Sequence, residues 1–475
     1  MRPLALAAAF WLAPESTWAH GLGQRYDLPI PLSLYLVGAA AAVAASFAFL
    51  ALFRGSGKHS ARLARRMRIA GRVPSAVVAV FEAVAVAAFV FIIAAGLFGN
   101  QSTFKNIAPT AFWVLWWVGF TFLCAFVCNL WPLVNPPAIL FRWSDALWRR
   151  LAGTSLSRNL PYPRRLGAWP AVALFLIFAW TELVAPQRDV PRNIAIAILL
   201  YSALVWIGSF LFGALTWLRS ADAFAITFGL LGRFAPLQVA QLGNRWRWRL
   251  RPYAVGLLSS RALPVSMTVF TLAVLATVTV DGFLETPAWV AVANLAADVL
   301  PAGSAAALLP STLLLLAGPV VFAATYGVVI IVMARMMRVP KSSWLPLAGR
   351  FVLSLVPIAI AYHLAHYLSF LLLAGQLIIP LVSDPFGFGW DLFGTTLYRL
   401  DIGIVDARFV WITSVISIVL GHIIATWLAH ETALSIFQTS AQARRSQYPM
   451  LCLMIAYTVT SLWILAQPIV ETKPG

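Results

Sequence analysis

The sequence predicts an all-α protein that crosses a membrane about ten times as a bundle of helices. Of its 475 residues, 61% are hydrophobic and only 11% are charged, whereas an ordinary soluble domain has roughly 25% charged residues. Apolar runs of the ~20 residues that a helix needs to span a bilayer recur along the chain. These runs lack the alternation of barrel strands, and backbone groups in lipid must bond internally, so helices follow. The expected spans lie near residues 30–53, 75–97, 109–130, 169–186, 194–216, 264–283, 308–333, 351–375, 409–430 and 449–467.

Residues 1–19 have the features of a cleavable signal peptide. Arg2 precedes an apolar stretch, and the end of the segment at residues 17–19 is typical of a cleavage site. Cleavage before His20 places the mature N-terminus outside the membrane. Because no shift in composition marks a separate soluble domain, residues 20–475 are expected to form a single transmembrane domain.

The net charge of +18 is best explained by membrane topology. Basic residues accumulate in cytoplasmic connections of membrane proteins, so a nucleic-acid partner is not required. The connections expected to be cytoplasmic hold 26 Lys and Arg, and the outer connections and tails of the mature chain hold 7. This distribution predicts a multi-pass protein of the cytoplasmic (inner) membrane of a bacterium, with the lipid bilayer as its main partner. The cytoplasmic connections are 54–72, 131–168, 217–262, 335–350 and 431–447.

Three segments depart from the pattern of plain spans and short connections. Three prolines within residues 128–137 must end or unwind the third span. The apolar stretch 351–382 is longer than one crossing needs, so it is tilted, broken or continued as a short interfacial helix. The outer connection 383–408, rich in Gly and aromatic residues, is either a lid over a site or an aromatic collar at the headgroups.

The main chemical signal is the presence of histidines within apolar spans. Of six histidines, His363 and His366 lie three residues apart in the eighth span, and His422 lies in the ninth. Consecutive antiparallel helices are usually neighbours. Imidazole suits zinc, copper, iron and nickel, so these three residues are candidate ligands of a divalent metal ion. The alternative is that each histidine makes a structural hydrogen bond between helices.

The depth of these histidines also allows haem. At ~1.5 Å per residue, His363 and His422 lie roughly 11 Å apart along the normal of a ~30 Å hydrocarbon core. This separation fits a haem or a bridged ion better than one shared metal.

Other residues could complete such a site. Cys124 and Cys128 share one helix face in the third span and could bind a soft metal, although buried cysteine is also a good packing residue. Glu82 lies deep in the second span, where it could orient a ligating histidine. Glu182 lies near the outer edge, where it can reach water, and Asp281 is one of the outer acids that could attract a cation.

The mature chain resembles a family of bacterial multi-span membrane proteins, some of which are named fenitrothion hydrolase. The resemblance is carried by HGLGQRYDLPIP (20–31), NLWPLVNP (129–136) and the stretch 362–394, which runs from YHLAHYLSF to DPFGFGWDLFG. It implies hydrolysis of an organophosphate triester but assigns no role to any residue.

Such an activity fits a metal site in a membrane. Cleavage of a neutral phosphotriester needs an activated hydroxide and an electrophile, which metal ions supply together. The histidines would hold the metal, and Asp384 or Asp391 would activate water if the outer loop folds inward. An apolar small-molecule substrate would concentrate in the lipid around the enzyme.

Three non-hydrolytic functions compete with this hypothesis. The intramembrane histidines could serve a haem or copper electron carrier, or line the path of a metal permease. The chain could also position a second membrane subunit, with purely structural histidines. The sequence contains no GxxxxGK(S/T), HExxH or GxSxG motif, which argues against an ATPase, a standard zincin and an ordinary serine hydrolase.

Overall fold

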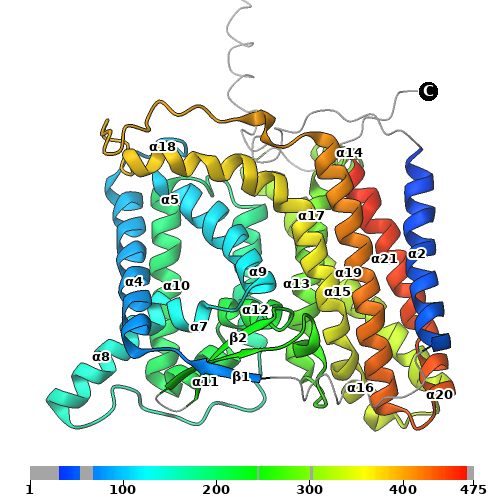
Figure 1. Ribbon diagram of the computed structural model, residues 1–475. Helices are drawn as coiled ribbons and strands as arrows, with labels where there is room; N and C mark the ends of the chain where they lie inside the picture. The colour runs from blue at the N-terminus through cyan, green and yellow to red at the C-terminus, as the bar shows by residue number, and fades with distance from the viewer. Residues whose placement is uncertain (1–30, 54–67, 243–244, 300–302, 468–475) are drawn as a thin grey trace, which may run out of the picture.

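The computed structural model describes residues 31–53, 68–242, 245–299 and 303–467. The expected signal peptide, residues 1–19, lies outside these ranges. Within them, nine helical segments are long and apolar enough to cross a membrane, and they stand beside one another in one bundle (Figure 1). They are α2 (Leu32–Phe53), α4 (Ser75–Phe98), the run α5–η3–α6 (Ile107–Phe126), α10 (Pro191–Phe212), α13 (Val265–Leu284), α15 (Ser304–Met336), the run from Lys341 to Ser383, α19 (Ala407–Ile436) and α20–α21 (Ser440–Ala466).

A shorter helix accounts for the remaining expected span. The apolar helix α9 (Trp169–Leu183) falls where the span 169–186 was expected but has only 15 residues. A second short apolar helix, α14 (Pro287–Val299), lies in a stretch expected to be a connection. The prediction of a helical bundle is therefore confirmed, and nine segments in the described part of the chain, rather than ten, have the length and apolar composition to cross a membrane.

A small sheet that the sequence analysis did not predict lies at one end of the bundle. Three antiparallel strands, β1 (Arg68–Arg72), β2 (Leu237–Leu242) and β3 (Arg245–Leu250), are arranged in the order β1-β3-β2. The alternating Arg and Trp residues of β3 have the period of two that a strand requires. We call this the sheet end; α8 (Pro136–Ala152) and α11 (Ala214–Ser220) also lie there, while α18 (Ile378–Ser383) and the loop after it cross the opposite, loop end (Figure 1).

Both predicted breaks in the spans are present. After α6 (Phe120–Phe126), the Pro-rich segment forms the short helix α7 (Trp131–Val134) and then turns into α8. The long apolar stretch is divided by 3-10 turns into α16 (Trp344–Phe351), α17 (Val356–Ala374) and α18. Proline and surplus length thus predicted where the helices break.

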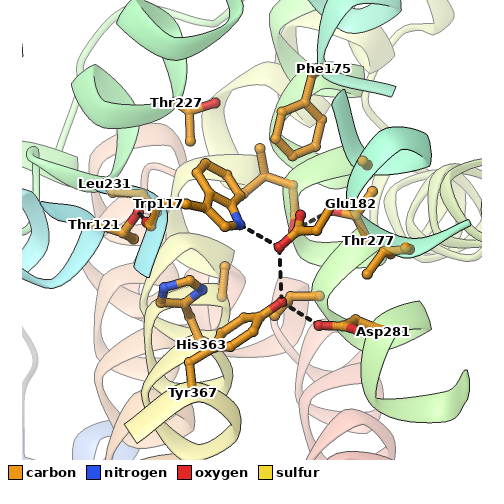
Figure 2. A pocket seen from close by; sticks show the side chains of 15 residues that line it. Trp117, Thr121, Phe175, Glu182, Thr227, Leu231, Thr277, Asp281, His363 and Tyr367 are labelled. Carbon is orange, nitrogen blue, oxygen red and sulfur yellow. Dashed lines mark hydrogen bonds between the residues drawn. The ribbon is translucent and has the colours of Figure 1, made fainter. Parts of the chain in front are cut away.

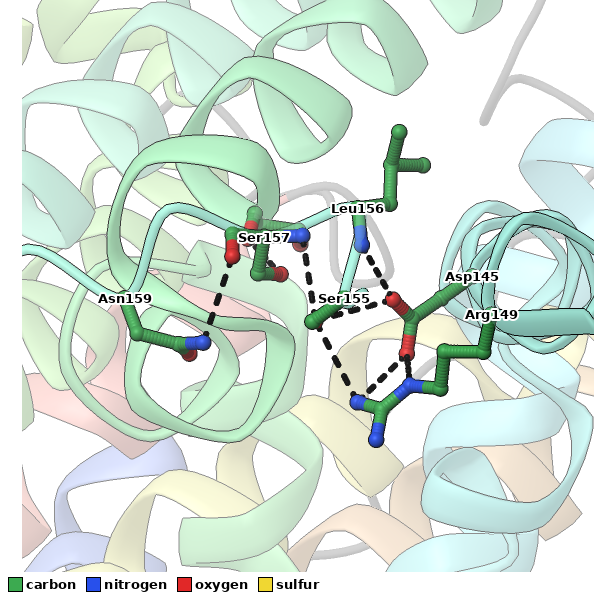
Figure 3. A network of polar contacts seen from close by, with 7 residues as sticks. Asp145, Arg149, Ser155, Leu156, Ser157 and Asn159 are labelled. Carbon is green, nitrogen blue, oxygen red and sulfur yellow. Dashed lines mark hydrogen bonds and ion pairs between the residues drawn. The ribbon is translucent and has the colours of Figure 1, made fainter. Parts of the chain in front are cut away.

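Helix α8 is held in place by charged side chains along its length. In its middle, Arg142 donates to Glu82 at 2.7 Å, and Trp143 donates to the same carboxylate at 3.2 Å. Further along, Asp145 accepts from Arg149 at 2.9 Å and from the Leu156 backbone at 2.7 Å, as Figure 3 shows. Glu82 therefore anchors α8 to α4, and its hydrogen bonds go to Arg142 and Trp143 rather than to a predicted metal ligand.

The tightest crossing in the bundle joins α17 and α19. Gly421 of α19 lies so close to α17 that a Cβ atom there would collide with Ala361 and come within 2.9 Å of the Pro357 carbonyl oxygen. Ser414 also donates to the Ala365 carbonyl oxygen at 3.1 Å. This crossing fixes the position of α17, which carries His363 and His366.

Candidate functional site

Four helical segments meet around a group of polar side chains near the loop end, three of them buried and the fourth, that of Glu182, half-buried. Glu182 comes from α9, Asp281 from α13, and His366 and Tyr367 from α17; we call these four residues the acid–tyrosine cluster. Trp117 reaches the cluster from the π-helix η3 (Thr110–Gly119) (Figure 2). π-Helical turns are rare and occur frequently at functional sites.

The hydroxyl of Tyr367 joins the two carboxylates of the cluster. It donates a very short hydrogen bond to Asp281 and lies 3.4 Å from Oε1 of Glu182 (Figure 2). Trp117 Nε1 donates to the same Glu182 oxygen at 2.5 Å. A tyrosine hydroxyl carries a single proton, so it can donate to only one of the two carboxylates at a time.

His366 completes the cluster by pairing with Asp281. Its Nε2 lies 3.0 Å from the Asp281 carboxylate, and the two side chains are only 4% and 9% exposed. Ion pairs that are removed from water in this way are costly unless both partners are well satisfied. In a membrane span, such groups are functional candidates by default.

A small, partly open cavity adjoins the cluster. Its volume is about 40 Å³, and its polar lining includes Glu182, Asp281, Tyr367 and His363. A water molecule needs roughly 10–15 Å³ of such space, so the cavity can hold a few waters. Sites for drug-sized ligands usually measure about 300–1,000 Å³, so a large substrate does not fit in this conformation.

His363 lines this cavity, and one of its ring nitrogens makes no hydrogen bond to a described residue. Its Nε2 is buried and has no hydrogen-bond partner among the described residues. The ring packs between aromatic side chains, with centroids 4.6 Å from Tyr367 and 5.2 Å from Phe122. A water in the cavity would be a natural partner for this nitrogen.

The cluster lies close to the loop end of the bundle. Glu182 is one residue from the end of α9, and Asp281 is three residues from the end of α13. The Arg188 side chain, in the connection after α9, donates to the Glu182 carbonyl oxygen. Glu285, just beyond α13, has a pKa raised to about 7, because burial and the nearby Asp281 outweigh His366 and Arg188.

The structure brings together only two of the predicted metal ligands. His363 lines the cavity and His366 pairs with Asp281, but His422 bonds through Nδ1 to the Ile418 carbonyl oxygen of its own helix, at 2.8 Å. Cys124 and Cys128 are buried in the third span, where the Cys124 thiol lies 3.7 Å from Asn129 Oδ1. No group of three or more His, Cys, Asp or Glu among the described residues is arranged to hold a metal ion. The metal site therefore stays a prediction, and the described residues do not provide a cluster of ligands for it.

The predicted catalytic aspartates have structural partners in the outer loop. Asp384 accepts from the backbone N–H groups of Phe388 and Gly389, at 2.9 and 2.7 Å, and thereby shapes the turn. Asp391 accepts from the Thr396 backbone. Neither aspartate lines the cavity, and both are bound within the loop at the surface of the loop end.

Sequence reasoning missed the residues that bind the cluster together. Asp281 stood out only as one of several outer acids, and Tyr367 was not singled out. A signal for both was present, because Asp281 interrupts the apolar stretch VTVDGFL and Tyr367 directly follows His366. An acid within a span is costly enough to require a partner on another helix.

Comparisons with known proteins do not identify a relative of this chain. No protein-family model, no curated protein and no solved structure matches the chain.

Proposed function

We propose that this protein transfers protons within the membrane through the acid–tyrosine cluster. The observation that carries the proposal is one tyrosine hydroxyl placed between a buried carboxylate, Asp281, and a half-buried one, Glu182, on a different helix, with a histidine paired to Asp281. Chains of Asp, Glu and His in membrane spans are typical of proton relays in pumps and transporters.

The arrangement supports movement of a proton between defined groups. Tyr367 can pass its proton to one carboxylate while accepting a proton from the other, because a hydroxyl both donates and accepts. His366 stabilises the charge left on Asp281, and the adjoining cavity has room for the waters that would extend the relay to His363. The steps among Glu182, Tyr367, Asp281 and His366 join groups within hydrogen-bond reach.

The distribution of charge suggests the direction from which protons arrive. We propose that the sheet end faces the cytoplasm of a bacterial cell, because the five connections expected there hold 26 Lys and Arg. The cluster lies near the opposite end, beside Glu285 and Arg188. Protons would therefore enter from the outer face of the inner membrane.

Proton flux into proteoliposomes tests this function. Wild-type protein should acidify vesicles that contain a pH-sensitive dye when a K⁺ diffusion potential is imposed, and protein-free vesicles should not respond. Tyr367→Phe keeps the ring but removes the bridging hydroxyl, so flux should fall about tenfold or more. Tyr326→Phe is the matched control, since it removes another buried hydroxyl, one that donates to Ala348 at 2.7 Å.

Two results would contradict the proposal. Wild-type flux no faster than that of protein-free vesicles would show that the protein does not transfer protons across the membrane. Equal flux in wild type and Tyr367→Phe would show that protons do not pass through the acid–tyrosine cluster.

Hydrolysis of an apolar phosphotriester is the second candidate, and His363 is the residue that favours it. A buried imidazole nitrogen without a partner, beside a water-sized cavity, can accept a proton from a water that attacks phosphorus. The cavity would have to open before a triester could enter, because its volume is only about 40 Å³.

A direct assay separates this candidate from proton transfer. Release of the phenol from a fenitrothion-type triester should require the purified protein and disappear in His363→Gln. His422→Gln is the matched control, because that histidine is also buried with an unpartnered Nε2 but does not line the cavity. No phenol release by wild-type protein would exclude the hydrolytic candidate.

A further inference from the structure

The small sheet carries a row of arginines on one face. Arg247 and Arg249 alternate with Trp246 and Trp248 along β3, so the arginines share one side of the strand. Arg72 of β1 lies directly opposite Arg247 in the register of the sheet. We call Arg72, Arg247 and Arg249 the arginine face.

The arginine face lacks anionic partners within the protein. Like charges placed directly opposite each other in a sheet are destabilising, and none of the ion pairs between described residues includes any of these three arginines. The Nε of Arg247 is enclosed without a hydrogen-bond partner. An external anion held between Arg72 and Arg247 would relieve both problems, and guanidinium groups match phosphate geometry.

An apolar groove lies on the opposite face of the sheet, where Trp248 of β3 pairs with Val239 of β2. It measures about 390 Å³, is open to the surface, and is lined by Arg72, Val73, Pro74, Leu237, Val239 and Trp248. Since β1 is an edge strand, a ligand at Arg72 can reach both the arginine face and the groove. The site thus offers a cationic part and an apolar part on the two faces of the sheet, and Arg72 belongs to both.

The position of the groove indicates which amphiphile it meets. Helix α4, a candidate membrane span, begins at Ser75, only three residues after Arg72. At ~3.3 Å per extended residue, Arg72 lies about 10 Å from the start of that span, at the depth of lipid headgroups. A phospholipid in the adjacent leaflet can therefore reach the site without leaving the bilayer.

We propose that this site binds an anionic phospholipid, with its phosphate at Arg72 on the edge of the arginine face and part of an acyl chain in the groove. The sheet joins residues 68–72 to residues 237–250, so a bound lipid would hold these distant segments together. The proposal does not depend on proton transfer or hydrolysis.

Lipid binding can be measured on the full-length protein in detergent. Phosphatidylglycerol should raise the melting midpoint and appear as bound lipid in native mass spectra, whereas phosphatidylcholine should do so weakly. Arg72→Gln, Arg247→Gln and Arg249→Gln combined should lose both effects. The matched control replaces the exposed Arg150, Arg164 and Arg165 by Gln, which removes the same charge and should change neither effect.

Further ligands and variants identify what binds and control for misfolding. Inorganic phosphate and glycerol phosphate carry the anion without the chains, so they should give less than half of the shift. Val239→Gln leaves the arginines intact but makes the groove polar, and it should weaken phosphatidylglycerol binding at least threefold. Arg72→Gln alone changes one exposed side chain and serves if the triple variant does not fold.

Three outcomes would overturn the proposal. Equal lipid retention by wild type and the arginine variants would show that the arginine face does not bind lipid. A full shift with glycerol phosphate would show a site for a free phosphate compound, and equal losses in the control variant would show non-specific attraction.

Discussion

A single substitution in the pair formed by Asp281 and His366 should strongly destabilise the protein. Both side chains are almost completely buried, and they meet at 3.0 Å. Breaking such a pair by removing one partner usually costs more than the pair itself contributes, because the other charge stays buried. The stability of the site therefore depends on keeping the two residues matched.

His366→Ala should lower the free energy of unfolding by about 3–5 kcal/mol, because it leaves the Asp281 carboxylate without its histidine. The melting midpoint of the purified protein in detergent measures this loss. Adding Asp281→Asn to His366→Ala should recover part of the stability, since the buried charge is then removed. A double variant less stable than His366→Ala would contradict this explanation.

Glu285 gives the loop end a dependence on pH. Its pKa is raised from 4.5 to about 7, mainly by burial, so the folded protein binds a proton that the unfolded chain has released between these values. Stability from this group is therefore present below about pH 4.5 and is lost as pH rises through about 7. The melting midpoint should fall over this range in wild type and fall less in Glu285→Gln. Identical pH profiles would contradict the prediction.

At the scale of elements, the crossing of α17 and α19 decides whether the site can form. Gly421 allows the two helices to touch, and α17 carries three of the residues beside the cavity. Small residues at such contacts are typical of helix pairs in membranes, because they permit close approach of the backbones. The site thus depends on a glycine that makes no contribution to its chemistry.

Gly421→Leu should force α17 and α19 apart and destabilise the protein by about 1–3 kcal/mol or more. Gly327→Ala in α15 is the control, because a Cβ there meets nothing within 4 Å. Thermal unfolding in detergent compares the two variants. A loss of stability in Gly327→Ala as large as that in Gly421→Leu would show that packing space is not the cause.

Breaks in the helices were predictable, but the sheet was not. Proline removes a backbone donor and clashes with the preceding turn, so the three prolines within residues 128–137 predict that the third span ends there. β3 was misread because its arginines are equally typical of a basic loop at a membrane. Its pairing with β1 joins segments far apart in the sequence, and no local pattern records such pairing.

For the site, the sequence indicated the histidines of α17 but not the carboxylates and the tyrosine that lie beside them. His363 and His366 were recognised because polar side chains in a span need partners, but which partners they have depends on how four helices pack. His422 fits the same pattern and lies elsewhere. Residue types therefore predicted a polar site in α17, whereas its acid–tyrosine character required the tertiary structure.

The orientation of the whole molecule rests on its basic connections. Leu397 at the loop end is 91% exposed, and Leu151 in α8 at the sheet end is 76% exposed. In a background with Cys452→Ser, Leu397→Cys should react with a membrane-impermeant maleimide in intact cells. Leu151→Cys should react only after permeabilisation. The reverse pattern would place the sheet end outside and contradict the predicted topology.

The most direct test of proton transfer through the acid–tyrosine cluster is a double-mutant cycle on proton flux. Glu182→Gln, Asp281→Asn and the double variant are reconstituted at equal density, and their fluxes are compared with that of wild type. If one hydroxyl joins both carboxylates in a single path, either single substitution should lower the flux about tenfold or more, and the double variant should be no slower than the slower single one. Losses that multiply in the double variant, or single variants with wild-type flux, would contradict the account.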